Sequence, residues 1–172
     1  NQKLLEVEYK NMLLLKEHGI FVPKVIHKND DRLVIEYIQG DLAADLAERL
    51  DTVSDWVDEL ALWMANLHQI SRGAEVLLKG DVNLRNFIYS GGHICGLDFE
   101  EISWGDPRTD LANICFFILT NTPSFTKEKH MMMRHFLHCY EKHSKIKLIG
   151  MAEYLLLSRT EAKRRRIGKK VK

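Results

Sequence analysis

The fold of this chain is decided by the stretch Lys79-Gly80-Asp81-Val82-Asn83-Leu84-Arg85-Asn86 together with Leu97-Asp98-Phe99-Glu100. Between them, Ser90-Gly91-Gly92 separates two short runs of β-forming residues, which is a strong signal for a hairpin turn. The sequence therefore predicts a β-hairpin with Asn86 and Asp98 at its open end.

Three polar side chains near this hairpin have the chemistry of a phosphoryl-transfer site. Asp81 precedes Asn86 by five residues, and Asp98 follows the second strand. Phosphoryl transfer needs a carboxylate that orients the attacking hydroxyl and two oxygen ligands for a hard cation beside the phosphates. The structural alternative is that Asp81 and Asn86 cap a turn while Asp98 ends a strand. Each residue alone favours that alternative, but the joint pattern favours the site.

The rest of the chain is predicted to be mainly helical. Apolar residues recur at helical spacing over residues 4–18, 56–71, 107–119, 127–140 and 151–166. Trp56, Trp63 and Met64 are expected in the core. Two β-rich runs, residues 22–26 and 33–38, flank a turn and predict a second hairpin. This order of elements predicts an α+β fold in which helix predominates.

The composition fits one ordinary globular domain. Of the 172 residues, 45% are hydrophobic and 28% are charged, which excludes disordered, collagen-like and membrane classes. The formal net charge of +1 gives no general attraction to nucleic acid. Cys95, Cys115 and Cys139 are odd in number and widely spaced, so neither a disulfide framework nor a zinc site is expected.

The sequence also gives expectations about the cellular compartment and about the two ends of the chain. No apolar run approaches the length that spans a bilayer, and residues 1–4 do not open a signal peptide, so a reducing cytoplasm is expected. Leu4 already belongs to a helical pattern, and we expect residues upstream of Asn1 to be missing. Basic residues crowd the other end, namely Arg159, Lys163, Arg164, Arg165, Arg166, Lys169, Lys170 and Lys172. They either complement a helix dipole or form the only candidate contact with nucleic acid.

The catalytic-looking stretches resemble the aminoglycoside phosphotransferase family, which includes choline kinase-like enzymes and belongs to the protein-kinase-like superfamily. The segment Trp104-Gly105-Asp106-Pro107-Arg108-Thr109-Asp110-Leu111-Ala112 is the most specific part of the resemblance, since ordinary protein kinases lack it here. Upstream, the helix from Glu8 to Gly19 and the segment Leu33–Gly40 are similar to the family's first long helix and its hinge. The resemblance covers nearly the whole chain.

The resemblance implies a bilobal kinase fold with particular residues in the site. Residues 1–40 would be a remnant of the N-terminal lobe, and residues 41–172 the helical catalytic lobe. Asp81 would be the catalytic base, and Asn86 and Asp98 would bind Mg²⁺ next to ATP or another nucleoside triphosphate. The resemblance also assigns Glu36, Tyr37 and Ile38 to the adenine pocket, Glu8 to a pairing with a phosphate-binding lysine, and Asp110 to bracing the catalytic loop.

Two departures from the family pattern affect the expected activity. No G-x-G-x-x-G loop and no strand lysine precede Glu8, which indicates either that part of the N-terminal lobe is missing or that this is a degenerate member of the family. In both cases this chain alone is expected to have weak or no activity. Lys79 stands where the family usually has histidine, and we expect it to form a salt bridge or to approach a phosphate. Glu100 and Glu101 either add oxygen ligands or are solvated acidic residues.

Three functions remain open from the sequence. The first is a kinase that phosphorylates a hydroxyl of a small molecule. The second is an atypical protein kinase or ATPase of tRNA modification, which the arginine-rich tail supports. The third is a pseudokinase that binds a nucleotide or a partner. The acceptor and the oligomeric state are not determined, no membrane partner is expected, and His135, His138 and His143 are interpreted as surface residues without a metal.

Overall fold

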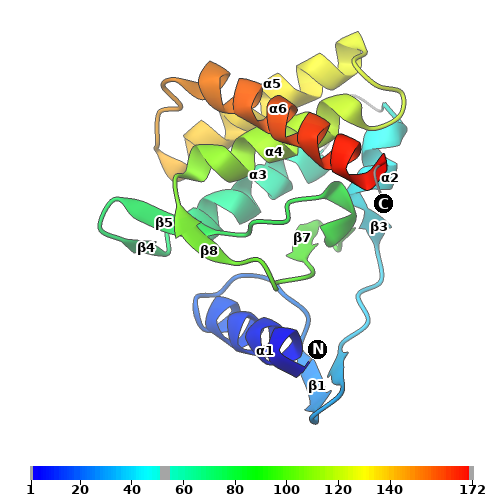
Figure 1. Cartoon of the computed structure of the whole chain (residues 1–172), viewed down its shortest axis with the longest axis vertical. Coiled ribbons are helices and arrows are strands. Elements are labelled where there is room, and N and C mark those ends of the chain that lie inside the picture. Colours follow the sequence, from blue (N-terminus) through cyan, green and yellow to red (C-terminus); the bar gives the residue numbers. More distant parts are fainter. Residues whose placement is uncertain (1, 51–54, 171–172) are drawn as a thin grey trace.

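Most helices of this protein lie on one side of its small sheets, and one helix lies on the other side (Figure 1). The computed structural model describes residues 2–50 and 55–170, with side chains through Thr160. Within these residues the helices are α1 (Gln2–Glu17), α2 (Ala43–Glu48), α3 (Asp55–His68), α4 (Pro107–Thr120), α5 (Lys127–Ser144) and α6 (Met151–Lys170). The strands are β1 (Val25–Lys28), β2 (Leu33–Ile35), β3 (Asp41–Leu42), β4 (Ser71–Arg72), β5 (Glu75–Leu78), β6 (Phe87–Ser90), β7 (His93–Gly96) and β8 (Ser103–Gly105).

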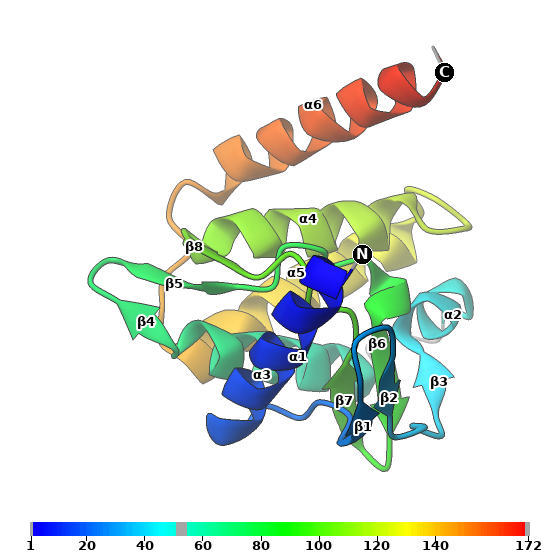
Figure 2. The same ribbon diagram turned by 60° about the horizontal axis from the view of Figure 1, so that its bottom comes forward.

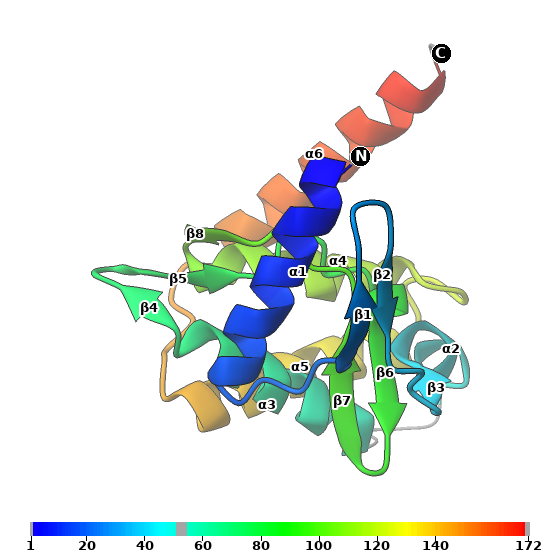
Figure 3. The same cartoon turned by 90° about the horizontal axis from the view of Figure 1, so that it is seen from below.

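The described strands form three antiparallel sheets. Strands β1 and β2 make a hairpin, β3, β6 and β7 make a second sheet, and β4, β5 and β8 make a third. Viewed from below, α1 lies beside the β1–β2 hairpin, on the side of the molecule away from α4 and α5 (Figure 3). The predicted α+β fold with a predominance of helix is confirmed.

The core lies among α3, α4 and α5. Helix α5 packs against α3, and α6 packs against α4. Figure 2 shows α6 next to α4 and leading away from it toward the C-terminus. Trp56, Trp63 and Met64 are at most 5% exposed, so the prediction that they belong to the core is confirmed. The indole of Trp63 also donates a hydrogen bond of 3.0 Å to the carbonyl oxygen of Phe21, which links the segment after α1 to this core.

The predicted central hairpin is present as β6 and β7. Ser90 pairs with His93, so the loop consists of Gly91 and Gly92 alone. Their φ angles are +57° and +87°, and a two-residue turn with φ positive at both positions matches the right-handed twist of the flanking strands. Glycine takes these angles without steric cost, which explains why the sequence signal was strong.

Some element boundaries differ from the prediction for identifiable reasons. The first strand begins at Val25 rather than Val22, because Pro23 has no amide hydrogen for a sheet. The second ends at Ile35, where the chain enters an extended connection to β3. Helix α3 ends at His68, since the chain then turns into β4.

The first and last helices can also be compared with their predicted boundaries. Helix α1 ends at Glu17, and Gly19 has a φ of +73°, as expected for a helix stop. The last helix extends beyond its predicted end to Lys170. The side chains of the basic tail from Lys163 onward lie outside the described residues. None of the described helices is long and apolar enough to cross a membrane.

Candidate active site

The loop after β5 is shaped by a close contact at Gly80. Its φ is +79°, and a side-chain carbon at this position would collide with the carbonyl group of Glu101. Only glycine therefore lets the chain leave β5 and pass under the segment that contains Glu101. The turn presents Asp81 directly after this contact.

Asp110 of α4 anchors the same loop through two backbone amides. Its carboxylate accepts a hydrogen bond of 2.7 Å from the Lys79 backbone amide and one of 3.2 Å from the Gly80 amide. The side chain is 1% exposed, and His68 Nε2 lies 3.5 Å from it. Tyr140 completes this buried network through its hydroxyl, 2.9 Å from His68 Nδ1. The bracing role that the resemblance implied for Asp110 thus has a direct geometric basis.

Asp81 is half-buried and its carboxylate faces the start of the next turn. Oδ1 accepts a hydrogen bond of 3.1 Å from the Asn83 amide. The Asn83 side chain in turn accepts one from the Arg85 amide and caps η1 (Leu84–Asn86). Within the described residues Asp81 Oδ2 has no hydrogen-bond donor, so one oxygen remains available to a hydroxyl. The turn-capping alternative and the catalytic alternative therefore use different oxygens of the same carboxylate.

Asn86 and Asp98 lie at the open end of the β6–β7 hairpin. The Leu97 amide donates a hydrogen bond of 2.8 Å to the Asn86 carbonyl, which continues the strand pairing by one step. Asp98 then adopts a φ of +58° and its side chain is exposed. Asn86 Nδ2 lies 3.4 Å from the Asp81 carbonyl oxygen, which leaves its side-chain oxygen free of that contact. The backbone therefore brings Asp81, Asn86 and Asp98 to one place.

Two oxygen-bearing side chains suit the metal that the resemblance implies. Mg²⁺ prefers hard oxygen ligands and keeps several waters or phosphate oxygens in its shell. One carboxylate, at Asp98, and one amide oxygen, at Asn86, fit that preference. In the part of the chain that the structure describes, no cluster of three or more His, Cys, Asp or Glu side chains forms an all-protein metal cage. The donor set fits a cation shared with phosphates.

Lys79 is a buried cation between these two segments. It is 0% exposed, and Nζ donates hydrogen bonds of 2.7 Å to the Asp81 carbonyl and 2.8 Å to the Asp98 carbonyl. The ammonium also lies 5.5 Å from the ring centre of Phe87 and 5.1 Å from that of Phe99. Burial lowers the pKa of Lys79 to about 8, against the opposing effect of Asp81 and Asp98.

The position of Lys79 corrects an expectation from the sequence. A salt bridge or an approach to a phosphate was expected, but the ammonium is sealed from solvent and binds backbone carbonyls instead. The sequence did not show whether Lys79 is buried or exposed, because the residues before it, Leu77 and Leu78, are apolar, whereas Gly80 after it marks a turn. His68 and Tyr140, which support Asp110, were not identified from the sequence at all, since they come from helices distant in the chain.

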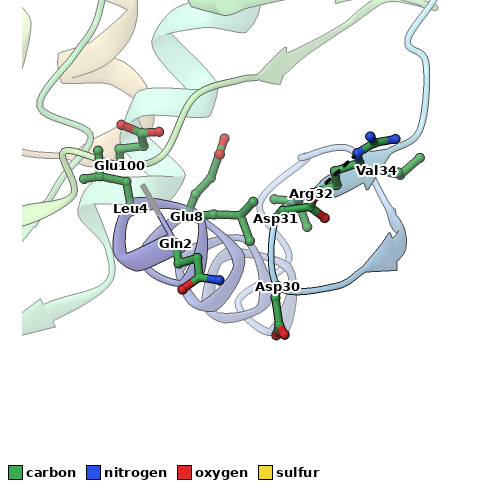
Figure 4. A pocket seen from close by; sticks show the side chains of 10 residues that line it. Gln2, Leu4, Glu8, Asp30, Asp31, Arg32, Val34 and Glu100 are labelled. Carbon is green, nitrogen blue, oxygen red and sulfur yellow. Dashed lines mark ion pairs between the residues drawn. The ribbon is translucent and has the colours of Figure 1, made fainter.

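Glu8 faces the acidic side of this site from α1. Burial raises its pKa, and the nearby carboxylates of Asp98 and Glu100 raise it further. Glu8 and Glu100 line a cavity of about 600 Å³, where Figure 4 shows both side chains on the same side of α1. No ion pair to Glu8 is present among the described residues. The Asn11 side chain holds α1 to this segment by donating 2.7 Å to the Phe99 carbonyl.

The residues expected at the adenine pocket lie in the extended connection between β2 and β3. The Glu36 amide donates 2.8 Å to the Lys24 carbonyl, which fixes the start of the connection. Tyr37 is 87% exposed, and Ile38 is half-buried. A side-chain carbon at Gly40 would collide with the Tyr89 carbonyl, so the connection runs close against β6. The connection therefore contacts Lys24, just before β1, at its start and β6 at its end.

One histidine differs from the interpretation made from the sequence. His143 of α5 lies 2.5 Å from the Asp58 carboxylate of α3, so it has a carboxylate partner that the sequence spacing did not reveal. His143 lowers the pKa of Asp58 through this contact. This pair joins two packed helices, and it is separate from the residues of the candidate site.

The chain is similar to known proteins in sequence pattern and in fold. A model of the phosphotransferase enzyme family matches residues 36–130. The ADP-bound aminoglycoside phosphotransferase APH(2'')-Ib is 14% identical, with a TM-score of 0.66 and coverage of 91% of this chain and 71% of that one. The macrolide 2'-phosphotransferase of Brachybacterium faecium is 15% identical, with a TM-score of 0.66 and coverage of 90% and 70%.

A third similar solved structure is a kinase of another kind. The ethanolamine kinase of Plasmodium vivax is 14% identical, with a TM-score of 0.67 and coverage of 90% of this chain and 63% of that one. No curated protein sequence matches the chain. At such identities the structural similarities establish the fold, which is protein-kinase-like, as the sequence predicted.

Proposed function

This chain belongs to the phosphotransferase enzyme family, and on that premise we propose that it transfers the γ-phosphoryl group of ATP, or another nucleoside triphosphate, to a hydroxyl of a small molecule. One observation carries the proposal. The buried Lys79 ammonium binds the carbonyls of both Asp81 and Asp98, so the residue with the free carboxylate oxygen and one proposed metal ligand are held at a fixed spacing. Fixed positioning is the main contribution of a protein to phosphoryl transfer.

In this proposal Asp81 is the base. The hydroxyl oxygen forms a bond to the γ-phosphorus while the bond from that phosphorus to the bridging oxygen breaks, and the nucleoside diphosphate leaves with that oxygen. The hydroxyl proton passes to Asp81 Oδ2, the oxygen without a donor among the described residues. Asp81 mainly aligns the nucleophile, because the proton is lost late in a loose transition state.

Asn86 and Asp98 would hold Mg²⁺ against the phosphates. The ion neutralises charge that develops on the phosphate oxygens when it is bound. Asp98 is exposed on a backbone turn with positive φ, which directs its carboxylate away from the core. Asn86 is fixed by the pairing of its carbonyl with the Leu97 amide. Glu36, Tyr37 and Ile38 would line the adenine pocket, and Glu8 would face the phosphates.

The division of the chain follows the same proposal. Residues 1–40 would contribute to the N-terminal lobe, and residues 41–172 would form the catalytic lobe. Glu8 has no cationic partner among the described residues, and Lys79 is too deeply buried to supply one. We therefore propose that these 172 residues alone turn over slowly.

Titration calorimetry with MgATP tests the metal and nucleotide part of this function. Asp98→Asn should weaken binding at least about tenfold, because a hard anionic ligand is lost. Asp45→Asn removes an exposed carboxylate from α2, away from the cavity that Glu8 and Glu100 line, and serves as the control. Equal MgATP affinity for the wild-type chain and Asp98→Asn, or no MgATP binding by the wild-type chain, would refute the assignment.

A further inference from the structure

A large cavity lies at the end of α4, away from the Asp110 anchor. It has a volume of about 850 Å³, and apolar side chains from α4, α5, α6 and the α4–α5 connection form most of its wall: Phe116, Leu119, Phe125, Met133, Leu155 and Leu156. A volume of this size is typical of sites that bind small organic molecules. Phe125 is 60% exposed and Leu156 64% exposed, so part of this wall is open to ligand.

A second, smaller cavity lies between this cavity and the catalytic loop. The smaller cavity has a volume of about 150 Å³ and is lined by Asn83 and Arg85, which follow Asp81, and by one carboxylate, Glu48, whose charge Arg85 offsets. Thr120 lines both cavities. A molecule with its hydroxyl at Asp81 would therefore extend past Asn83 and Thr120 into the larger space.

Helix α6 forms one wall of the larger cavity and is fixed in place by α4. The Tyr154 hydroxyl donates 3.1 Å to Asp106, and the Ser158 hydroxyl donates 2.8 Å to the Asn113 side chain. Arg108 also donates 2.7 Å to the Ile149 carbonyl, just before α6 begins. These contacts hold α6 next to α4 (Figure 2), so this wall exists before a ligand arrives.

The charges on the wall select against a cationic ligand. The polar residues that line the cavity are Thr120, Ser124, His130 and Arg159, and none of the described lining residues is a carboxylate. A polycation would lose water against apolar side chains without gaining an ion pair, and it would face Arg159. An acidic group gains from Arg159, and an apolar body gains from leaving water.

We propose that this cavity binds the acceptor, and that the acceptor is an apolar-bodied alcohol that carries an acidic group. The inference rests on the proposed phosphotransferase function and names the substrate class for that same site. Its ligand is recognised by burial of the apolar body and by the Arg159 guanidinium, while the hydroxyl reaches Asp81.

Three probes of equal chain length separate these contributions: 8-hydroxyoctanoate, 1,8-octanediol and 8-amino-1-octanol. Titration calorimetry should give the tightest binding for the anion and the weakest for the cation. Arg159→Glu should lower the affinity for 8-hydroxyoctanoate at least about fivefold and leave that for 1,8-octanediol nearly unchanged. Tightest binding of the cationic probe to the wild-type chain would overturn the proposal.

A cavity-filling variant locates the bound probe. Ala152 lines the cavity from α6 and is exposed, so Ala152→Trp should fill the space without disturbing the core and lower the affinity for 8-hydroxyoctanoate about tenfold or more. Glu153→Trp places the same bulk on the next, exposed position of α6, which does not line the cavity, and should leave the affinity unchanged. Equal effects of the two variants, or none from Ala152→Trp, would show that the probe binds elsewhere.

Phosphate transfer from labelled ATP distinguishes failure of this inference from failure of the function. Asp81-dependent transfer to an acceptor whose KM does not respond to Ala152→Trp would refute the cavity as acceptor site and keep the phosphotransferase. If 8-hydroxyoctanoate binds in the cavity but no acceptor receives phosphate in an Asp81-dependent way, the proposed phosphotransferase function is refuted. The proposed role of the cavity as acceptor site is then refuted as well. Transfer to 8-hydroxyoctanoate that Ala152→Trp impairs, with MgATP affinity unchanged, is the expected result.

Discussion

The ammonium of Lys79, which follows β5, donates a hydrogen bond of 2.8 Å to the carbonyl oxygen of Asp98, which follows β7. The same ammonium donates 2.7 Å to the Asp81 carbonyl. One buried cation thus joins the segment with the proposed base to the segment with the proposed metal ligand. Hydrogen bonds from charged donors are stronger than those between neutral groups, so this link restricts the relative movement of the two segments.

Replacement of Lys79 should reduce turnover because it frees the two segments. Small displacements of reacting groups cost about 10²-fold in rate, so Lys79→Met should lower kcat by about 10- to 100-fold. Lys79→Arg keeps a cationic donor and should retain more activity than Lys79→Met. Steady-state kinetics with MgATP measure the effect, and Lys24→Met at an exposed site is the control. Unchanged kcat in Lys79→Met would contradict a positioning role.

The depressed pKa of Lys79 predicts how stability varies in alkaline solution. The ordinary pKa of a lysine is 10.5, and that of Lys79 in the folded chain is about 8, so between these values the unfolded chain binds more protons. The free energy of unfolding therefore rises with pH across that window, by up to about 3 kcal/mol from this group. Urea unfolding at pH 7.5 and pH 10 measures the change.

The comparison with Lys79→Met isolates this contribution. Burial raises the pKa values of the thiols of Cys95 and Cys139, to about 12 and about 11, which lowers stability as pH rises above 9 in both proteins. The wild-type chain should therefore gain stability relative to Lys79→Met between pH 7.5 and pH 10. A constant difference between the two proteins across this range would show that Lys79 does not titrate there.

Loss of Asp110 should destabilise the fold through unpaired backbone amides. Asp110→Ala leaves the buried amide of Lys79 and the partly buried amide of Gly80 without their acceptor, and a buried donor without a partner costs about 1–3 kcal/mol. Urea unfolding should show a loss of about 2–5 kcal/mol in the free energy of unfolding. Asp45→Ala, on the exposed side of α2, should cost much less. Equal losses in the two variants would disprove the anchoring role.

Asp106 should contribute a pH-dependent increment of stability. The Arg108 guanidinium beside it lowers the pKa of this carboxyl to about 2 from 3.8. The increment is therefore fully present above pH 3.8 and is lost as pH falls through about 2. Because the side chain is partly exposed, Asp106→Asn should cost only about 1 kcal/mol at pH 7, measured by urea unfolding. A difference that persists below pH 2 would have another origin.

Asp81 should affect turnover and not nucleotide binding. Asp81→Asn removes the proton acceptor, so in a protein that also carries the glycine-rich loop and the phosphate-binding lysine, kcat should fall by about 10²-fold or more, while the affinity for MgATP stays nearly the same. Single-turnover kinetics and titration calorimetry on the same preparation separate the two quantities. Near-normal turnover in Asp81→Asn with the true acceptor would remove the catalytic role from this residue and favour a pseudokinase.

The sequence by itself determined the parts of the fold that depend on local chemistry. Gly91 and Gly92 impose a two-residue turn, Asp106 followed by Pro107 starts a helix, and Gly19 ends one. The spacing of Asp81, Asn86 and Asp98 around one hairpin predicted the candidate site, because a hairpin brings its two ends together wherever it is placed. These signals lie within a few residues of the feature that they determine.

Only the tertiary structure decided the environment of the charged residues. Lys79 is buried because Phe87 and Phe99 close over it, and Glu8 meets Asp98 and Glu100 because α1 packs against their segment. The short strands β4, β5 and β8 were likewise not predicted, since Val76 pairs with Gly105 across a long stretch of chain. Burial and long-range pairing depend on residues far apart in the sequence, whereas a periodic pattern reports only on near neighbours.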